Sequence, residues 1–273
     1  MRNILSILFV VCLFVSVPFA QPGPKIHPSV YYTYGDYSDK TRSNSISGYV
    51  PFTWNGFDYI TLGYDNLNID NTDWKYHQQL FLAAGSFNFY PFYLKLGYLH
   101  IKGDFEYKPY PGFDYSDFLN LYGAEVLYNI NLLYLGISFD YSNLIGYQAL
   151  VIKHYGASVL WIINPNLSLE LKPLYTSITD GRKLFGASLG LNYSPTKPLT
   201  LKLYGFAGER AYYYDEDLLT MFNQNETQKN LASFRVEYDI VQELTLIGNY
   251  QYTEFQNYII RYYVAGIKFN LSL

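Results

Sequence analysis

The sequence predicts an all-β protein, an antiparallel, up-and-down transmembrane β-barrel of about 14 strands. Three observations lead to this prediction. The 273-residue chain is rich in aromatic residues (20%) and poor in charged ones (15%), whereas an ordinary soluble domain has about 25% charged residues. Apolar and polar residues alternate with a period of two along almost the whole chain. The connections between these segments are short and long in turn, which is typical of outer-membrane barrels.

The first part of the chain has the layout of a cleaved export signal. Arg2 supplies a positive charge, the apolar run 4–17 is too short to span a bilayer as a helix, and Ala20 offers a cleavage point. This segment contains the only cysteine, Cys12, so we expect a mature chain without disulfides. The expected parts are a signal peptide over 1–20, an extended periplasmic leader over 21–28, and a single barrel domain over 29–273.

Each predicted strand has an apolar face and a face of small or polar residues. In 133–141, Leu135 and Ile137 face one side, whereas Gly136 and Ser138 face the other. Such a repeat is expected where one face contacts lipid and the other a polar lumen, although a soluble sandwich also alternates. Counts of 12 and 16 strands remain alternatives. The predicted strands are 29–37, 43–51, 57–66, 77–89, 92–102, 117–128, 131–142, 147–162, 166–178, 183–193, 198–211, 229–240, 243–254 and 257–271.

Aromatic residues at the ends of the apolar faces favour the barrel over the sandwich. One set lies near the short turns and includes Trp54, Phe92 and Trp161; the other lies near the long loops and includes Trp74 and Tyr141. Two such girdles around an apolar band are typical of proteins in a bilayer. An even strand number places both chain ends on the short-turn, periplasmic side. The longer connections are predicted at 37–42, 66–76, 103–116, 143–146, 179–182, 211–229 and 254–257.

Residues that could support catalysis or metal binding do not converge in the sequence. The four histidines are scattered, and no cysteine or carboxylate cluster accompanies them. His154 and Ser158 share a strand face but lie about 13 Å apart at the strand rise, too far for the histidine to activate the serine. We therefore expect no enzyme activity, no catalytic residues, no metal site and no cofactor.

The inward-facing register carries charges of both signs. Buried charges must be paired or hydrated, and inward positions such as Gly136 and Ser188 leave room for water. Barrels of about eight strands are filled by side chains, whereas those of 16–18 strands enclose channels. The predicted strand number lies nearer to the channels, so we expect a water-filled lumen. The alternative is that the charges pair across the wall and that the loop 211–229 plugs the lumen. The candidate lumen-lining charges are Lys95, Glu125, Asp140, Glu170, Lys172, Arg182, Lys202, Arg210 and Lys268.

Three stretches of the chain resemble the outer-membrane β-barrels of the YaiO type. They are VYYTYGDYS at 30–38, GERAYYYD at 208–215 and AGIKF at 265–269. The resemblance implies an outer-membrane barrel, and it brings no catalytic residues with it.

The function that these features indicate is that of a porin-like passive channel for small polar solutes or ions. The protein is expected in the outer membrane of a Gram-negative-type bacterium. A non-conducting surface barrel whose loops bind a ligand, lipid or partner is the first alternative, and an outer-membrane hydrolase is the second. Expected partners are outer-membrane lipids and the barrel-assembly machinery. A net charge of −4 gives no basic surface for nucleic acid.

Overall fold

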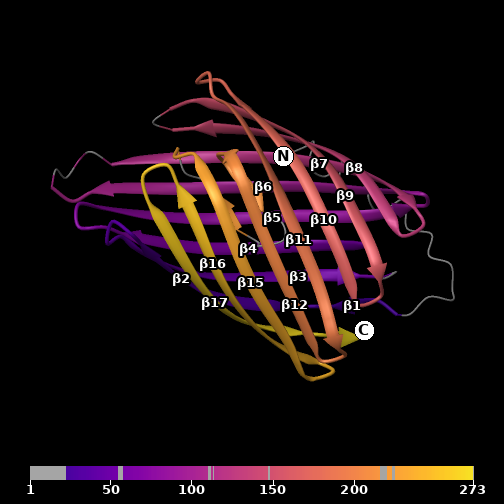
Figure 1. The fold of residues 1–273 in the computed structure, drawn as a ribbon. Helices are drawn as coiled ribbons and strands as arrows, with labels where there is room; N and C mark the ends of the chain where they lie inside the picture. The colour runs from indigo at the N-terminus through magenta and orange to yellow at the C-terminus, as the bar shows by residue number, and fades with distance from the viewer. Residues whose placement is uncertain are drawn as a thin grey trace, which may run out of the picture.

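The fold is a closed antiparallel barrel of fourteen strands (Figure 1), so the predicted fold class and strand number are confirmed. A computed structural model describes residues 23–54, 58–109, 112, 114–146, 148–215, 220–222 and 225–272; the predicted signal peptide lies outside them. The barrel strands are β2 (Ser29–Tyr37), β3 (Arg42–Thr53), β4 (Tyr59–Asp70), β5 (Trp74–Phe89), β6 (Phe92–Tyr107), β7 (Tyr115–Ile130), β8 (Leu133–Ile145), β9 (Leu150–Asn164), β10 (Leu167–Ile178), β11 (Lys183–Thr196), β12 (Leu199–Arg210), β15 (Gln228–Val241), β16 (Leu244–Phe255) and β17 (Ile259–Phe269).

Pairing of the first and last barrel strands closes the sheet. Along the chain each barrel strand pairs with the next, and β12 pairs with β15 across an insertion that contains the small hairpin of β13 (Tyr213–Asp215) and β14 (Thr220–Phe222). Strand β17 then pairs with β2, for example at Tyr263 and Tyr34. Because the sheet is closed, its barrel strands have no free edge, and their backbone groups are hydrogen-bonded within the wall.

The strands run further toward the long-loop end than the sequence predicts. The ladders of β4–β5 and β5–β6 continue to the pairs Asp70–Lys75 and Trp74–Tyr107, so the predicted connections 66–76 and 103–116 shrink to 71–73 and 108–114. Stacked aromatic rings on neighbouring strands stabilise these extensions. At the other end, β1 (Lys25–Ile26) in the predicted leader pairs with both β3 and β18 (Leu271–Ser272).

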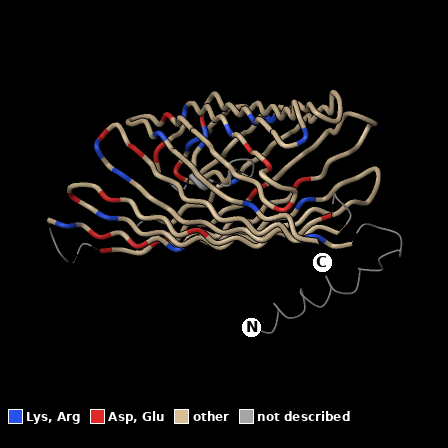
Figure 2. Tube along the Cα trace, turned by 90° about the horizontal axis from the view of Figure 1, so that it is seen from below, with Lys and Arg blue, Asp and Glu red and all other residues tan. Residues whose placement is uncertain are grey.

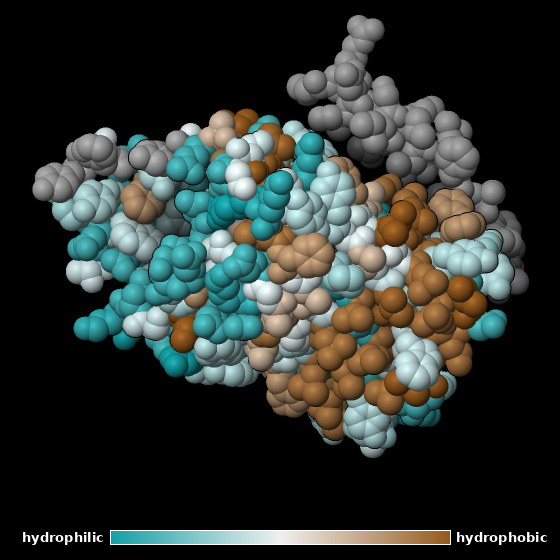
Figure 3. Space-filling model, turned by 45° about the horizontal axis from the view of Figure 1, so that its top comes forward, coloured by the Kyte–Doolittle hydropathy of each residue, from teal (hydrophilic) through white to brown (hydrophobic). Residues whose placement is uncertain are grey.

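The two faces of the wall follow the predicted register. Ile137 and Phe185 point outward and are 70% and 67% exposed, whereas Ser158 and Ser188 point inward and are buried. Figure 3 shows that outward-facing residues form a broad hydrophobic area, with hydrophilic residues gathered at one end of the molecule. Within the described residues, no helix has the length and apolar character needed to cross a membrane.

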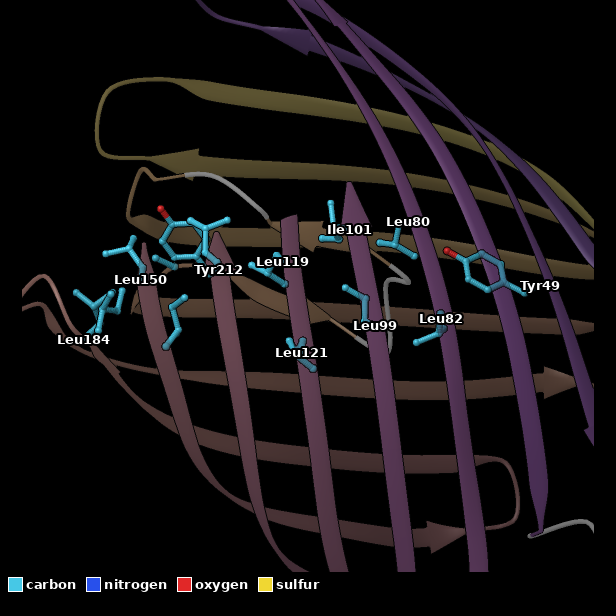
Figure 4. Close-up of a cluster of buried hydrophobic side chains, with 14 of the residues drawn as sticks. Tyr49, Leu80, Leu82, Leu99, Ile101, Leu119, Leu121, Leu150, Leu184 and Tyr212 are labelled. Atoms are coloured by element: carbon cyan, nitrogen blue, oxygen red, sulfur yellow. The ribbon is translucent and has the colours of Figure 1, made fainter. Parts of the chain in front are cut away.

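A belt of apolar side chains also lines much of the interior, beside the small and polar residues that were expected on the inward face. Its members come from β2, β3, β5 to β11 and β16, and the members labelled in Figure 4 point inward. On β5, for example, Leu80 and Leu82 are buried while Phe81 is exposed. The belt consists of Tyr31, Tyr49, Leu80, Leu82, Leu99, Ile101, Leu119, Leu121, Leu144, Leu150, Ile152, Ile178, Leu184 and Ile247.

Candidate functional site: the barrel interior

The chain that follows β12 turns into the barrel and packs against the apolar belt. Ala211 and Tyr212 are 2% and 3% exposed and belong to the same buried cluster as the belt. Figure 4 shows the Tyr212 ring at the level of Leu150 and Ile101. We call Ala211–Tyr214 the plug segment. From the sequence, a plug in this region was only the alternative to an open lumen, and in the structure the segment lies inside the barrel.

A buried histidine on β9 holds the plug segment in place. The His154 ring nitrogens lie 3.1 Å from the Tyr212 carbonyl oxygen and 2.8 Å from the Thr176 hydroxyl. A carbonyl oxygen only accepts, so Nε2 carries the proton and Nδ1 accepts from Thr176. The His154 ring also meets the Tyr213 ring edge-on, with centroids 5.6 Å apart. His154 therefore positions the plug, a role that its isolated place in the sequence did not indicate.

Arg210, at the end of β12, contacts the plug segment on the side of the inner cavity. Its guanidinium lies 4.1 Å from the centroid of the Phe206 ring and 4.4 Å from that of Tyr213, and its Nε donates to Gln228 Oε1. The side chain is 1% exposed. Cation–π contacts strengthen when the cation is desolvated, so Arg210 fixes the turn from strand into plug. It was predicted to line the lumen, and it lies inside the barrel as an anchor.

A further set of contacts, which we call the outer clamp, joins the connection 179–182 to Asn225 at the long-loop end. Arg182 donates to the backbone oxygen and to Oδ1 of Asn225, and the Tyr212 hydroxyl donates to the same Oδ1. Asp180 pairs with Arg182 at 2.7 Å. Partial burial tends to raise the pKa of the Asp180 carboxyl, but hydrogen bonds and charge from Arg182 outweigh this effect and lower that pKa. Arg182 therefore lies in a loop and not on the inward strand register.

The plug segment lies between two of the cavities in the barrel interior, an inner chamber and an outer cavity toward the long-loop end. The inner chamber, of about 160 Å³, is lined by Arg210, Tyr213 and Tyr214 from the plug side and by small and charged wall residues. The outer cavity, of about 360 Å³, has Tyr212 in its lining. The described lining of the outer cavity includes eight aromatic residues: Tyr37, Trp74, Tyr76, Phe105, Tyr115, Tyr212, Tyr258 and Tyr262. Trp74, predicted in the outward girdle, instead stacks on Phe105 inside this cavity.

One group of paired charges lies on β6, β7 and β10, toward the short-turn end. Lys95 pairs with Glu125 at 2.8 Å, and Ser158 donates to Glu125 at 2.7 Å. Lys172 pairs with Glu170 on its own strand at 3.1 Å. The chamber lining includes Lys95, Glu125 and Lys172, so these charges are paired and still reach the cavity.

A second group, on β12, β15 and β17, centres on Glu237, and we call it the Glu237 cluster. Its carboxylate lies 2.9 Å from Lys202, 3.0 Å from Arg235 and 3.2 Å from Lys268. The two lysines were predicted from the sequence to line the lumen, whereas Arg235 and Glu237 were not. Both lie on the inward face of β15 with Ser233, so their period-two spacing was the signal that could have found them.

The predicted charges thus fall into three places. Figure 2 shows acidic and basic residues following one another along the strands. Glu170, Lys202 and Lys268 belong to the ion-paired groups, and Arg182 belongs to the outer clamp. The predicted charges that line the inner chamber are Lys95, Glu125, Asp140, Lys172 and Arg210.

Among the described residues, no three histidine, cysteine or carboxylate side chains come together as a metal site.

The fold is similar to those of solved outer-membrane channels. No protein-family model and no curated protein sequence matches the chain. A TodX deltaS2S3 mutant, described as a monoaromatic hydrocarbon channel, superposes with a TM-score of 0.60 at 9% identity, over 93% of this chain and 92% of that one. The Pseudomonas putida toluene transporter TodX gives 0.54 at 8% identity, over 93% and 91%. At such identity the likeness establishes the fold, which is that of an outer-membrane β-barrel.

Proposed function

We propose that the protein is a porin-like channel of the outer membrane of a Gram-negative-type bacterium, closed in this structure by the plug segment. The observation that carries the proposal is that the plug segment separates two cavities of the barrel interior, with Tyr212 lining one and Tyr213 and Tyr214 lining the other. A barrel filled for stability alone would need no charged chamber, because even paired charges carry a desolvation cost when they leave water. Membership of the YaiO-type barrels is part of the same proposal.

The lining of the interior is suited to small solutes that carry a polar group. On the inner side of the plug, a solute meets ion pairs that are partly exposed, together with small residues such as Ser138, Gly156 and Ser188. On the outer side, it meets aromatic rings and carboxylates. The solved barrels of similar fold are described as a monoaromatic hydrocarbon channel and as a toluene transporter, and the aromatic rings of the outer cavity are compatible with a ring-bearing solute.

Single-channel recording with a Tyr212 variant tests the proposal. Tyr212 has a φ of 51°, in the left-handed region that favours glycine. Tyr212→Gly therefore removes the ring without straining the backbone, and we expect it to raise the conductance of refolded protein in planar bilayers. Tyr212→Phe keeps the ring and should conduct as the wild type does.

Two results would contradict the proposal. If neither the wild type nor Tyr212→Gly conducts, the barrel is not a channel. If both conduct equally, the plug segment does not close the path. Refolding of each variant is checked by its heat-dependent gel mobility.

A non-conducting barrel that binds a ligand at its surface is the second candidate. The outer cavity favours it, because Tyr212 and Asn225 line that cavity on the plug side and make it a cup instead of a passage. Ligand binding without conductance in Tyr212→Gly would support this candidate over the channel.

A further inference from the structure

The outer cavity combines aromatic rings with negative charge. Its volume of about 360 Å³ lies within the usual range for small-molecule sites. Eight of its eighteen described lining residues are aromatic, and three carry carboxylates: Asp39, Asp117 and Glu226. The described part of the lining contains no lysine, arginine or histidine. The cavity therefore offers negative potential next to the faces and edges of aromatic rings.

The hydrogen bonds to the three carboxylates come from neutral donors. The Tyr76 hydroxyl donates to Asp117 at 3.1 Å, Asn257 Nδ2 donates to Glu226 at 2.8 Å, and the Thr41 amide donates to Asp39 at 3.0 Å. These bonds orient the carboxylates and leave their negative charge in place. The guanidinium of Arg182, which contacts Asn225 at the cavity edge, is already paired with Asp180.

The rings stand on two walls of the cavity. On β5–β7, Phe105 stacks between Trp74 and Tyr115, with centroids 5.7 and 4.9 Å away. On the other wall, Tyr37 and Tyr258 have centroids 5.9 Å apart. The pocket lies between these two groups. Such an arrangement can contact a rounded group from more than one side.

We propose that the outer cavity binds a small organic cation, a protonated or quaternary amine whose alkyl groups contact the rings. A neutral hydrocarbon would desolvate three carboxylates without a compensating charge. An inorganic divalent ion would need several oxygen ligands at about 2–2.6 Å and would make no use of the rings. An organic cation uses both features, through cation–π contacts and the carboxylate field. This inference does not depend on conduction, so binding and conductance can fail separately.

Calorimetric titration of the refolded full barrel in detergent micelles tests the site with two matched probes. Choline carries a trimethylammonium group, and 3,3-dimethylbutan-1-ol has the same shape with carbon in place of nitrogen. We expect choline to bind in the millimolar range or tighter, and the neutral alcohol to bind at least about tenfold more weakly. Equal or tighter binding of the alcohol would identify an apolar-solute pocket and overturn the proposal, as would no binding of choline.

Three variants assign the binding to this cavity. Asp117→Asn keeps an oxygen that can accept from Tyr76, and it should weaken choline binding about fivefold or more by removing the charge. Trp74→Leu removes one wall ring and should have a similar effect. Asp73→Asn, in the connection beside β5 and outside the cavity lining, should bind choline as the wild type does. If Asp73→Asn lowers the affinity as much as Asp117→Asn does, choline responds only to the general charge of the loops. Heat-dependent gel mobility confirms folding, and Glu226→Gln replaces any variant that does not fold.

Discussion

Replacing Glu237 with glutamine should destabilise the barrel by about 3–5 kcal/mol, because it breaks a buried ionic cluster. The Glu237 side chain is 8% exposed and faces three cations, Lys202, Arg235 and Lys268, at 2.9–3.2 Å. Glutamine has nearly the same size and can still accept hydrogen bonds. The substitution therefore removes the charge while largely preserving the packing.

The magnitude follows from the geometry of the Glu237 cluster. At 3 Å and an effective dielectric constant of about 20, each contact has a Coulomb energy of about 5 kcal/mol. Desolvation of the carboxylate offsets much of the sum. Lys202 and Lys268 also reach water, with side chains 38% and 29% exposed, so screening reduces their share. Arg235 is the most buried of the three cations. The cost of leaving its charge without a counter-ion therefore sets the lower end of the expected loss, about 3 kcal/mol.

Equilibrium unfolding in guanidinium, followed by tryptophan fluorescence of the vesicle-refolded protein, measures the effect. The control is Asp104→Asn, which breaks the Lys102–Asp104 pair at 3.0 Å, where both side chains are more than 40% exposed; it should lose at most about 1 kcal/mol. Adding Arg235→Gln to Glu237→Gln should recover part of the loss, since it removes an unpaired cation. Equal losses in Glu237→Gln and Asp104→Asn, or no recovery in the double variant, would refute the reasoning.

Three further predictions concern the wall, the lumen and the outer clamp. Ile137→Arg should cost about 2–4 kcal/mol in unfolding experiments and Ser138→Arg much less; equal penalties would mean that the two faces are wrongly assigned. In the Tyr212→Gly background, neutralising Lys95, Lys172, Lys202 and Lys268 together should shift the reversal potential toward cations. The shift should be largest at low salt, where screening extends over about 30 Å; no shift would place the conducting path away from these lysines. Because the folded pKa of Asp180 is lowered, its pairing with Arg182 is intact above the ordinary pKa of 3.8 and is lost as the pH falls through the lowered value. Wild-type current should therefore rise in this acidic range, and a current that rises equally in Asp180→Asn would exclude the clamp as the cause.

The strand number and the two faces could be predicted because they depend on local alternation. In β8, outward Ile137 and inward Ser138 differ in polarity, so the period-two pattern identifies the lipid side. On β5, Phe81 faces outward and Leu82 inward, and both are apolar. Alternation cannot assign such a pair to a face, which is why the apolar belt was not predicted.

The plug contacts could not be predicted because they join residues far apart in the sequence. His154 meets the backbone of Tyr212, and Arg182 meets Asn225. No spacing rule connects these pairs, and each depends on where the insertion after β12 enters the barrel. The outward assignment of Trp74 was wrong for a similar reason, since its stacking on Phe105 depends on ladders that continue beyond the predicted strand ends.

The small strand β1 bears on the order in which the barrel is completed. It pairs with β3 on one side and β18 on the other, and it therefore bridges the short-turn end of the β2–β17 seam. We call this bridge the clasp. Two further hydrogen bonds belong to it: one joins the His27 ring to Asn270, and the other joins the Phe269 amide to the Pro28 carbonyl. The partners of this clasp come from both ends of the chain, so it can form only after the last strand has reached the first. The leader therefore stabilises the closed barrel. Its pairing opposes separation of β2 from β17, two strands that are not neighbours in the sequence and so cannot form a local hairpin.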